Sequence, residues 1–167
     1  YCPLQRFVIY PEDIHISHSM KSFIQNRSYE VSFNNDFEGV IKNCSQLRVK
    51  DEGAWLGEDM IKAYRRLHEQ NFATSVEVWN EEGKLVGGLY GVTISNVFCG
   101  ESMFSLEPNT SKLALIHLAQ ILKKTGNTII DCQMETPHLK SMGGRFIPYK
   151  EYMKYLLNQG CDHELLL

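Results

Sequence analysis

The sequence reads "TSVEVW" at residues 74–79, "LVGGLYGVTI" at 85–94 and "NVFCGESMF" at 96–104, with only short connections between them. Each stretch is rich in β-branched and aromatic residues, which favour strands. The first connection, "NEEGK", contains a glycine and is typical of a hairpin turn. These residues therefore predict three consecutive antiparallel strands in the middle of the chain.

Helical patterns surround these strands. Residues 57–72 place apolar side chains at helical spacing opposite charged ones, so one face of this helix packs and the other meets water. Residues 109–124 are apolar on almost every side, which predicts a buried helix ending at Gly126. The other expected elements are strands at 29–34 and 127–133 and helices at 37–47, 137–144 and 149–159. This order predicts an α+β fold around a mixed sheet.

The chain has 167 residues, of which 43% are hydrophobic, and this suits a single domain. We expect residues 28–160 to form that domain and residues 161–167 to be a tail. Residues 1–27 contain two helix-breaking prolines and are expected to form a leading segment with a short amphipathic helix.

The cysteines and the charge exclude several classes of protein. The five cysteines are odd in number, scattered and without a C-x-x-C pair, which disfavours disulfides and zinc and fits a reducing cytoplasm. No signal peptide and no run of about 18 apolar residues is present, so we expect no membrane span. The net charge of −3 gives no overall basic surface, so any nucleic acid must be met by a local patch.

"VFCGESMFS", residues 97–105, brings a thiol, a carboxylate and a hydroxyl together. Cys99 would need a histidine in reach to act as a nucleophile, and the favoured interpretation is a buried thiol. Ser102 lacks the G-x-S-x-G pattern. Glu101 is either functional or one half of a structural ion pair, since burying it alone is costly. Strand periodicity puts Cys99, Glu101 and Met103 on one face unless a bulge at Gly100 intervenes.

"IIDCQ", residues 129–133, is the second place where polar groups gather. On a strand, Asp131 and Gln133 emerge on one face about 6.6 Å apart, opposite Ile130 and Cys132. Together they can hold and orient an amine. They can equally be a polar pair that caps the strand end, and spacing does not separate the two.

The sequence leaves the roles of two further residues, Trp55 and His138, to be decided between alternatives. Trp55, before the helix at 57–72, is either a core anchor, which is favoured, or a stacking platform. His138 has no aligned acid and is interpreted as a loop or helix-cap contact.

The chain resembles a known family through motifs that occur in order from about Tyr1 to Gln159. They are "GAWLGEDMIKAYRRLHEQNFATSVEVW", "LVGGLYGV", "FCGESMFS", "SKLAL", "IDCQ" and "HLKSMGG" followed by "IP". Together they resemble the leucyl/phenylalanyl-tRNA–protein transferases of bacteria. The resemblance implies a GNAT-like fold, that of the acyl-CoA N-acyltransferases. It also implies that residues 1–27 are the remnant of, or the linker from, a missing N-terminal domain.

The implied activity is transfer of Leu or Phe, and by shape also Met, from aminoacyl-tRNA to the N-terminal Arg or Lys of a protein in the bacterial N-degron pathway. No metal or cofactor is implied, and we expect a cytoplasmic monomer without membrane contact. By similarity, Asp131 binds and helps to deprotonate the incoming amine together with Gln133, and Glu101 faces the aminoacyl-adenosine end. The pocket for the transferred side chain and its adenosine is implied to comprise Trp55, Leu89, Phe98, Met103, Leu115 and Ile130. Leu118 and Leu122 replace aromatic residues of the family, which predicts a wider pocket.

Two other functions remain in view. An acyl-CoA N-acyltransferase needs a glycine-containing pyrophosphate loop before the buried helix, and the corresponding "SLEPNTSK", residues 105–112, has no glycine. A truncated, non-catalytic module that binds tRNA ends or protein N-termini is the second alternative.

Overall fold

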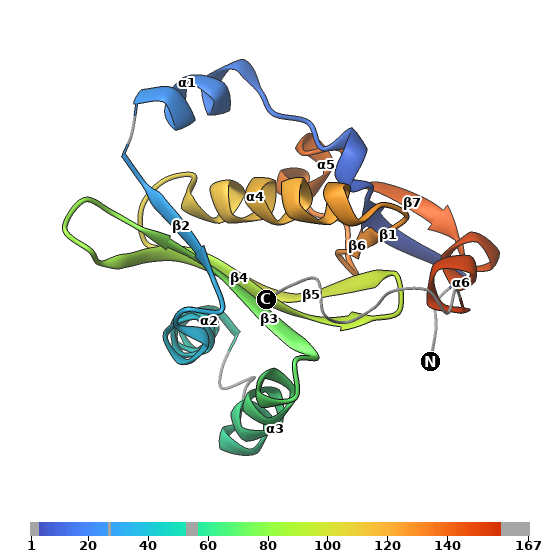
Figure 1. Ribbon diagram of the computed structural model, residues 1–167, viewed down its shortest axis with the longest axis horizontal. Coiled ribbons are helices and arrows are strands. Elements are labelled where there is room, and N and C mark those ends of the chain that lie inside the picture. The colour runs from blue at the N-terminus through green and yellow to red at the C-terminus, as the bar shows by residue number, and fades with distance from the viewer. Residues whose placement is uncertain (1–3, 27, 53–56, 158–167) are drawn as a thin grey trace.

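The computed structural model describes residues 4–26, 28–52 and 57–157 (Figure 1). The strands are β1 (Gln5–Ile9), β2 (Glu30–Phe33), β3 (Ala73–Trp79), β4 (Leu85–Ile94), β5 (Val97–Ser105), β6 (Ile129–Asp131) and β7 (Arg145–Pro148). The helices are α1 (His18–Asn26), α2 (Phe37–Glu52), α3 (Glu58–Glu69), α4 (Thr110–Thr125), α5 (Pro137–Ser141) and α6 (Tyr149–Leu157), with a 3₁₀ turn η1 at Pro11–Asp13. The expected α+β arrangement is confirmed.

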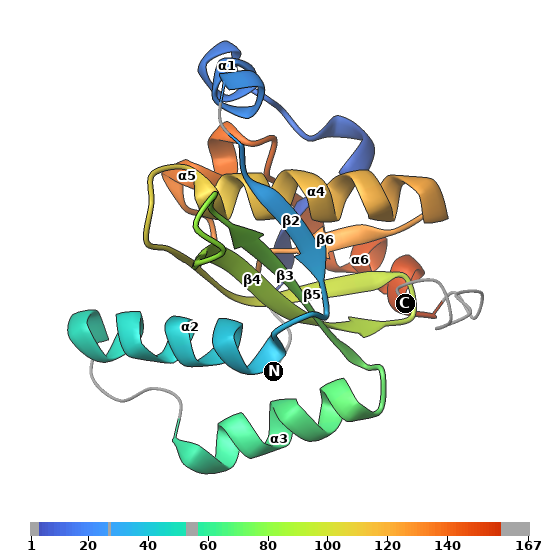
Figure 2. The same cartoon turned by 60° about the vertical axis from the view of Figure 1, so that its left-hand side comes forward.

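A seven-stranded mixed sheet organises the molecule, in the order β2-β3-β4-β5-β6-β1-β7. β3, β4 and β5 form the antiparallel meander expected from the sequence. β5 and β6 pair in parallel, which requires the crossover that α4 supplies. α4 covers one face of the sheet, while α2 and α3 pack on the other (Figure 2).

α4 is buried, as its sequence predicts. Leu115, Ile116 and Leu118 are each at most 2% exposed, and they pack with residues of β3, β4, β5 and β6 in the largest apolar cluster. A second cluster lies under α2 and α3, and a third lies between the sheet and α6. Each face of the sheet therefore has its own core.

Two strands were missed in the sequence. Residues 5–9, assigned to the leading segment, form β1, an interior strand between β6 and β7. Its residues Phe7, Val8 and Ile9 are buried on both faces, so no alternation marks the strand. β7 is a four-residue strand enclosed between two short helices. The strand expected at 127–133 is shorter than predicted at both ends, and comprises Ile129–Asp131.

A β-bulge in β5 reverses the expected alternation. Tyr90 pairs with Ser102 and Gly91 pairs with Gly100, so Glu101 is the extra residue. As a result Met103 packs with the cluster of Phe98 under α4, and Cys99 lies on the opposite face with α6. The simple alternation that put Cys99 and Met103 on one face is therefore wrong, and the alternative, a bulge beside Gly100, is confirmed.

Gly91 is needed beside this bulge because the strands approach closely. A Cβ atom there would lie 2.3 Å from the carbonyl oxygen of Cys99 and 2.5 Å from the ring of Phe98. Both contacts are shorter than side chains tolerate. The absence of a side chain at Gly91 thus makes room for the aromatic ring that forms one wall of the cavity described below.

Candidate functional site

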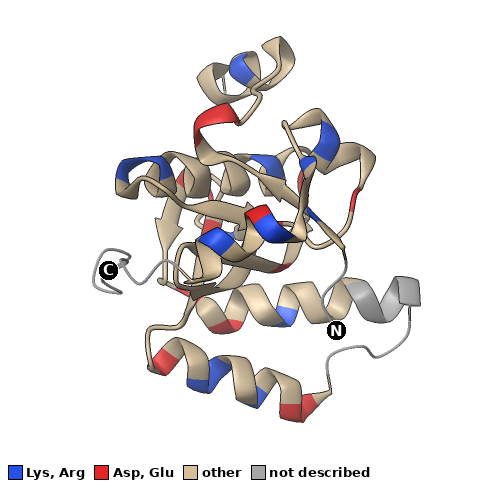
Figure 3. Ribbon diagram, turned by 90° about the vertical axis from the view of Figure 1, so that its right-hand side faces the viewer, with Lys and Arg blue, Asp and Glu red and all other residues tan. Residues whose placement is uncertain are grey.

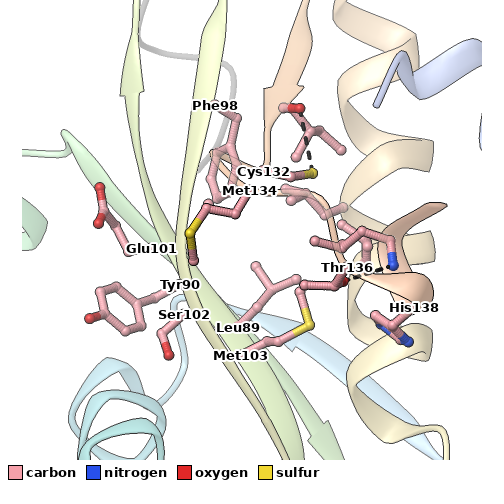
Figure 4. A pocket seen from close by; sticks show the side chains of 15 residues that line it. Leu89, Tyr90, Phe98, Glu101, Ser102, Met103, Cys132, Met134, Thr136 and His138 are labelled. Carbon is pink, nitrogen blue, oxygen red and sulfur yellow. Dashed lines mark hydrogen bonds between the residues drawn. The ribbon is translucent and has the colours of Figure 1, made fainter. Parts of the chain in front are cut away.

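An apolar cavity of about 230 Å³ lies between the sheet and α4 (Figure 4). Its walls come from β4, β5, β6, α4 and the segment after β6. Six of the seven residues expected to bind substrate line it: Leu89, Phe98, Glu101, Met103, Leu115 and Ile130. The seventh, Trp55, lies outside the described residues. Residues from four separate elements thus meet at one site.

The segment that follows β6 supplies lining residues that sequence reasoning missed. They are Cys132, Met134, Thr136, His138 and Leu139, and Leu118 joins them from α4. No periodicity marks this segment, because it is a loop followed by the short helix α5. The available signal was that the segment begins within "IDCQ" and continues directly after it in the chain.

His138 faces the cavity rather than only capping a helix. Its backbone carbonyl accepts a hydrogen bond from Ser141 Oγ at 2.7 Å, as expected of a loop contact. Its side chain, however, lines the cavity, and Nε2 is buried without a hydrogen-bond partner among the described residues. Burial, with a smaller effect from Lys112, lowers the pKa of the imidazole. At neutral pH this histidine is therefore predominantly neutral.

Glu101 stands apart from the apolar interior because of the bulge. The hydroxyl of Tyr64, on α3, donates a hydrogen bond to Glu101 Oε2 at 2.8 Å. In Figure 4 the Glu101, Tyr90 and Ser102 side chains lie on one side of the strands, and those of Leu89 and Met103 lie on the other. The site thus has an apolar interior and a carboxylate beside it.

Asp131 does not line the cavity. Its side chain is completely buried, on the face of the sheet opposite α4. Oδ2 accepts hydrogen bonds from Tyr152 Oη at 2.8 Å and from Arg6 Nε at 3.1 Å, and Arg6 also forms an ion pair with it. Oδ1 accepts the backbone N–H of Gln133 at 2.9 Å. Both oxygens of the Asp131 carboxylate therefore accept hydrogen bonds from the protein itself.

Gln133 leaves the strand and is exposed. Its φ of 65° lies in the left-handed region, so its side chain does not follow the expected strand alternation with Asp131. Its Nε2 donates to the carbonyl oxygen of Gly100, on β5, at 3.2 Å. The backbone of Gln133 thus contacts Asp131 on β6, and its side-chain amide contacts the neighbouring parallel strand β5.

Cys99 is predicted to be an unreactive thiol. Burial, with contributions from the charges of Asp131 and Glu101, raises its pKa to about 11. Since the thiolate is the reactive form, iodoacetamide should modify Cys99 slowly at pH 7.5 and about tenfold faster for each pH unit up to about 11. Mass spectrometry of the Cys99 peptide measures this rate. Alkylation at pH 7.5 as fast as that of an unfolded cysteine peptide would contradict the burial.

Comparison with known proteins agrees with this architecture. Residues 8–157 match the family described as leucyl/phenylalanyl-tRNA protein transferase. The leucyl/phenylalanyl-tRNA–protein transferase of Chromohalobacter salexigens is 46% identical over 156 residues, which cover 93% of this chain and 60% of that protein. The one from Psychromonas ingrahamii is 46% identical over 168 residues, covering 96% of this chain and 70% of that protein. The chain belongs to this family, and it spans only part of the length of these relatives.

The fold is also found among solved structures. L-PGS from Bacillus licheniformis matches with a TM-score of 0.55 at 15% identity, over 78% of this chain and 48% of that chain. At this identity the match concerns the fold alone. With the family and the mixed sheet established, the GNAT-like α+β fold class expected from the sequence is confirmed.

Within the described residues, no helix is long and apolar enough to cross a membrane. The same residues contain no group of three or more histidine, cysteine, aspartate or glutamate side chains able to hold a metal ion.

Proposed function

We propose that this chain transfers Leu or Phe, and also Met, from aminoacyl-tRNA to the N-terminal Arg or Lys of a protein. The observation that carries the proposal is the apolar cavity, which lies beside the segment holding Asp131 and Gln133. Transfer of Leu or Phe from tRNA to a protein is the activity that the names of the similar proteins describe. We further propose that it serves the bacterial N-degron pathway in the cytoplasm and that the protein acts as a monomer.

The size and lining of the cavity suit one amino-acid side chain. An apolar cavity of about 150 Å³ in another protein holds a benzene molecule, so about 230 Å³ accommodates a benzyl or isobutyl group. Met103 and Met134 are unbranched and adapt to either shape. Side chains branched at Cβ, such as Val and Ile, are wide where the cavity must admit the ester, and they are excluded by shape.

The reaction needs little more than alignment. The neutral α-amine of the acceptor attacks the ester carbonyl carbon, the carbon–oxygen bond to the ribose breaks, and the ribose hydroxyl leaves with a proton. An α-amine has a pKa near 8 and is partly neutral at pH 7. Gln133, which is exposed, contacts this amine, and the negative charge of Asp131 beneath it favours loss of the proton. In this proposal Glu101 contacts the aminoacyl-adenosine end, and Trp55 is assigned to the pocket for the transferred side chain and its adenosine.

We propose that the tRNA is contacted locally, since α2 and α3 carry charges of both signs in Figure 3. On α2 and α3, Arg65 is paired with Glu38, and Lys62 lies 3.5 Å from Asp59. Arg65 lowers the pKa of Glu38, which keeps that carboxylate charged. No single basic face is seen in this view, so we propose that contact is concentrated on the acceptor end of the tRNA.

The alternative use of acyl-CoA is disfavoured by the start of α4. Acyl-CoA enzymes of this fold need free backbone N–H groups there for a pyrophosphate. Here the Thr110 N–H donates to the Glu107 carbonyl at 3.4 Å and the Ser111 N–H donates to Ser105 Oγ at 2.9 Å. These donors are already satisfied by the protein itself.

The proposal is tested by incubating the protein with tRNA charged with labelled Leu or Phe and a peptide that begins with Arg or Lys. The assay uses the 167-residue chain and, in parallel, the same chain with any flanking residues that its gene encodes. Label on the peptide is the expected result, and a peptide beginning with Ala is the matched control. No transfer above an enzyme-free blank, with intact charged tRNA, would refute the enzymatic proposal.

A further inference from the structure

Four groups from distant parts of the chain form one hydrogen-bonded network on the α6 face of the sheet. Asp131 lies at its centre, with Arg6 from β1, Tyr152 from α6 and the backbone of Gln133 around it. We infer that Arg6 and Tyr152 are positioning residues that orient Asp131 and, through it, Gln133. The inference rests on the proposed function, in which Gln133 meets the acceptor amine.

The fold holds Arg6 beside Asp131. Val8 is the strand partner of Asp131, and Arg6, two residues earlier on β1, shares its face of the sheet. The Arg6 Cζ atom lies 5.3 Å from the centre of the Tyr152 ring, within the range of a cation–π contact. The guanidinium is thus oriented by an aromatic ring and a carboxylate at once, while 20% of its side chain remains exposed.

Tyr152 is a permanent donor in this network. It is only 4% exposed, and its pKa is raised by burial and then by the hydrogen bond to Asp131 and the charge of that carboxylate. The phenol therefore stays protonated and donates to Asp131 Oδ2 throughout the working pH range. Because Arg6 also donates to Oδ2, the other oxygen, Oδ1, points to the Gln133 N–H.

The bond from Gln133 to Oδ1 has a conformational consequence. An aspartate that accepts the N–H two residues later forms a tight local turn. Here it stabilises the left-handed backbone of Gln133, which a residue with a side chain rarely adopts. The turn directs the Gln133 amide to the carbonyl of Gly100. Arg6 and Tyr152 therefore influence the reaction indirectly, because they fix the orientation of the Gln133 side-chain amide.

Tyr152→Phe removes the donor and keeps the ring, and Tyr155→Phe is its matched control. Tyr155 is on the same helix, but its ring meets Tyr10 edge-to-face, whereas the hydroxyl bonded to Asp131 is that of Tyr152. We expect Tyr152→Phe to lower kcat about tenfold or more with little change in KM for charged tRNA, since a hydrogen bond to a charged group is lost. Tyr155→Phe should leave kcat unchanged. Equal kcat values for wild type and Tyr152→Phe would overturn the inference.

A second measurement does not depend on turnover. Amide hydrogen exchange of Gln133, followed by NMR, should be about tenfold faster in Tyr152→Phe and unchanged in Tyr155→Phe. Unaltered exchange in Tyr152→Phe would overturn the inference even if the protein proved inactive. Arg6→Lys should keep more activity than Arg6→Met, because it retains the charge. If Asp131→Asn loses transfer and Tyr152→Phe does not, the inference fails and the proposed function stands.

Discussion

Asp131→Asn is expected to lower the rate of aminoacyl transfer by about 100-fold or more, the contribution typical of a group that assists proton transfer. Asparagine has nearly the same shape but lacks the negative charge that favours loss of a proton from the acceptor amine. It can still accept a hydrogen bond from Tyr152 or Gln133. The measurement is kcat with saturating charged tRNA and an Arg-initiated peptide.

The controls for Asp131→Asn separate chemistry from folding. The substitution leaves the Arg6 guanidinium without its counter-charge, and we expect a loss of up to about 3 kcal/mol in the free energy of unfolding, since Arg6 is partly exposed. Activity is therefore compared well below the melting temperature of the variant. Cys99→Ala, on the same face of the sheet, should keep transfer within about twofold of wild type. Full activity in a folded Asp131→Asn protein would remove Asp131 from the proposed chemistry.

Leu118→Phe is expected to change which amino acid is transferred. Leu118 is completely buried on α4 and lines the cavity, so the larger ring takes space that the substrate side chain would occupy. The ratio of kcat/KM for Phe to kcat/KM for Leu should fall by about tenfold or more, because a difference of one or a few carbon atoms has this effect in a tight pocket. Competition between the two charged tRNAs measures the ratio directly.

Leu122→Phe is the matched control for this change. Leu122 is buried on the same helix at 2% exposure but does not line the cavity. Leu122→Phe should cost about 1–3 kcal/mol of stability through overpacking, and Leu118→Phe should cost no more, because its ring enters cavity space. Only Leu118→Phe should alter the ratio of Phe to Leu transfer. The same shift in both variants would show that the preference depends on general packing and not on cavity space.

Local sequence patterns predicted the central elements well. The strand at 85–94 and the buried helix at 109–124 agree closely with β4 and α4, since strand composition and helical periodicity act within a few residues. Six pocket residues taken from a family resemblance meet around one cavity. Their roles in transfer, and those of Asp131 and Gln133, stay predictions.

Long-range features were not predictable in this way. β1 was missed because its identity as a strand depends on partners more than 120 residues away. The strand at 129–131 ends before Gln133 because the Gln133 N–H donates to the Asp131 side chain and the Gln133 backbone is left-handed. Residue composition does not predict this local hydrogen bond. His138 faces the cavity only because α5 and α4 border the same space. Each miss reflects tertiary contacts that override local preference.

The position of β1 in the sheet also constrains how the protein is made. Residues 5–9 leave the ribosome long before their partners in β6 and β7 are synthesised. Until then the other strands can assemble, but β1 has no strand partner. Its apolar residues Phe7, Val8 and Ile9, which are buried in the finished fold, are then exposed to chaperones or to other chains. Closing so long a loop is slow, so the final step of folding should be the one that completes the network around Asp131.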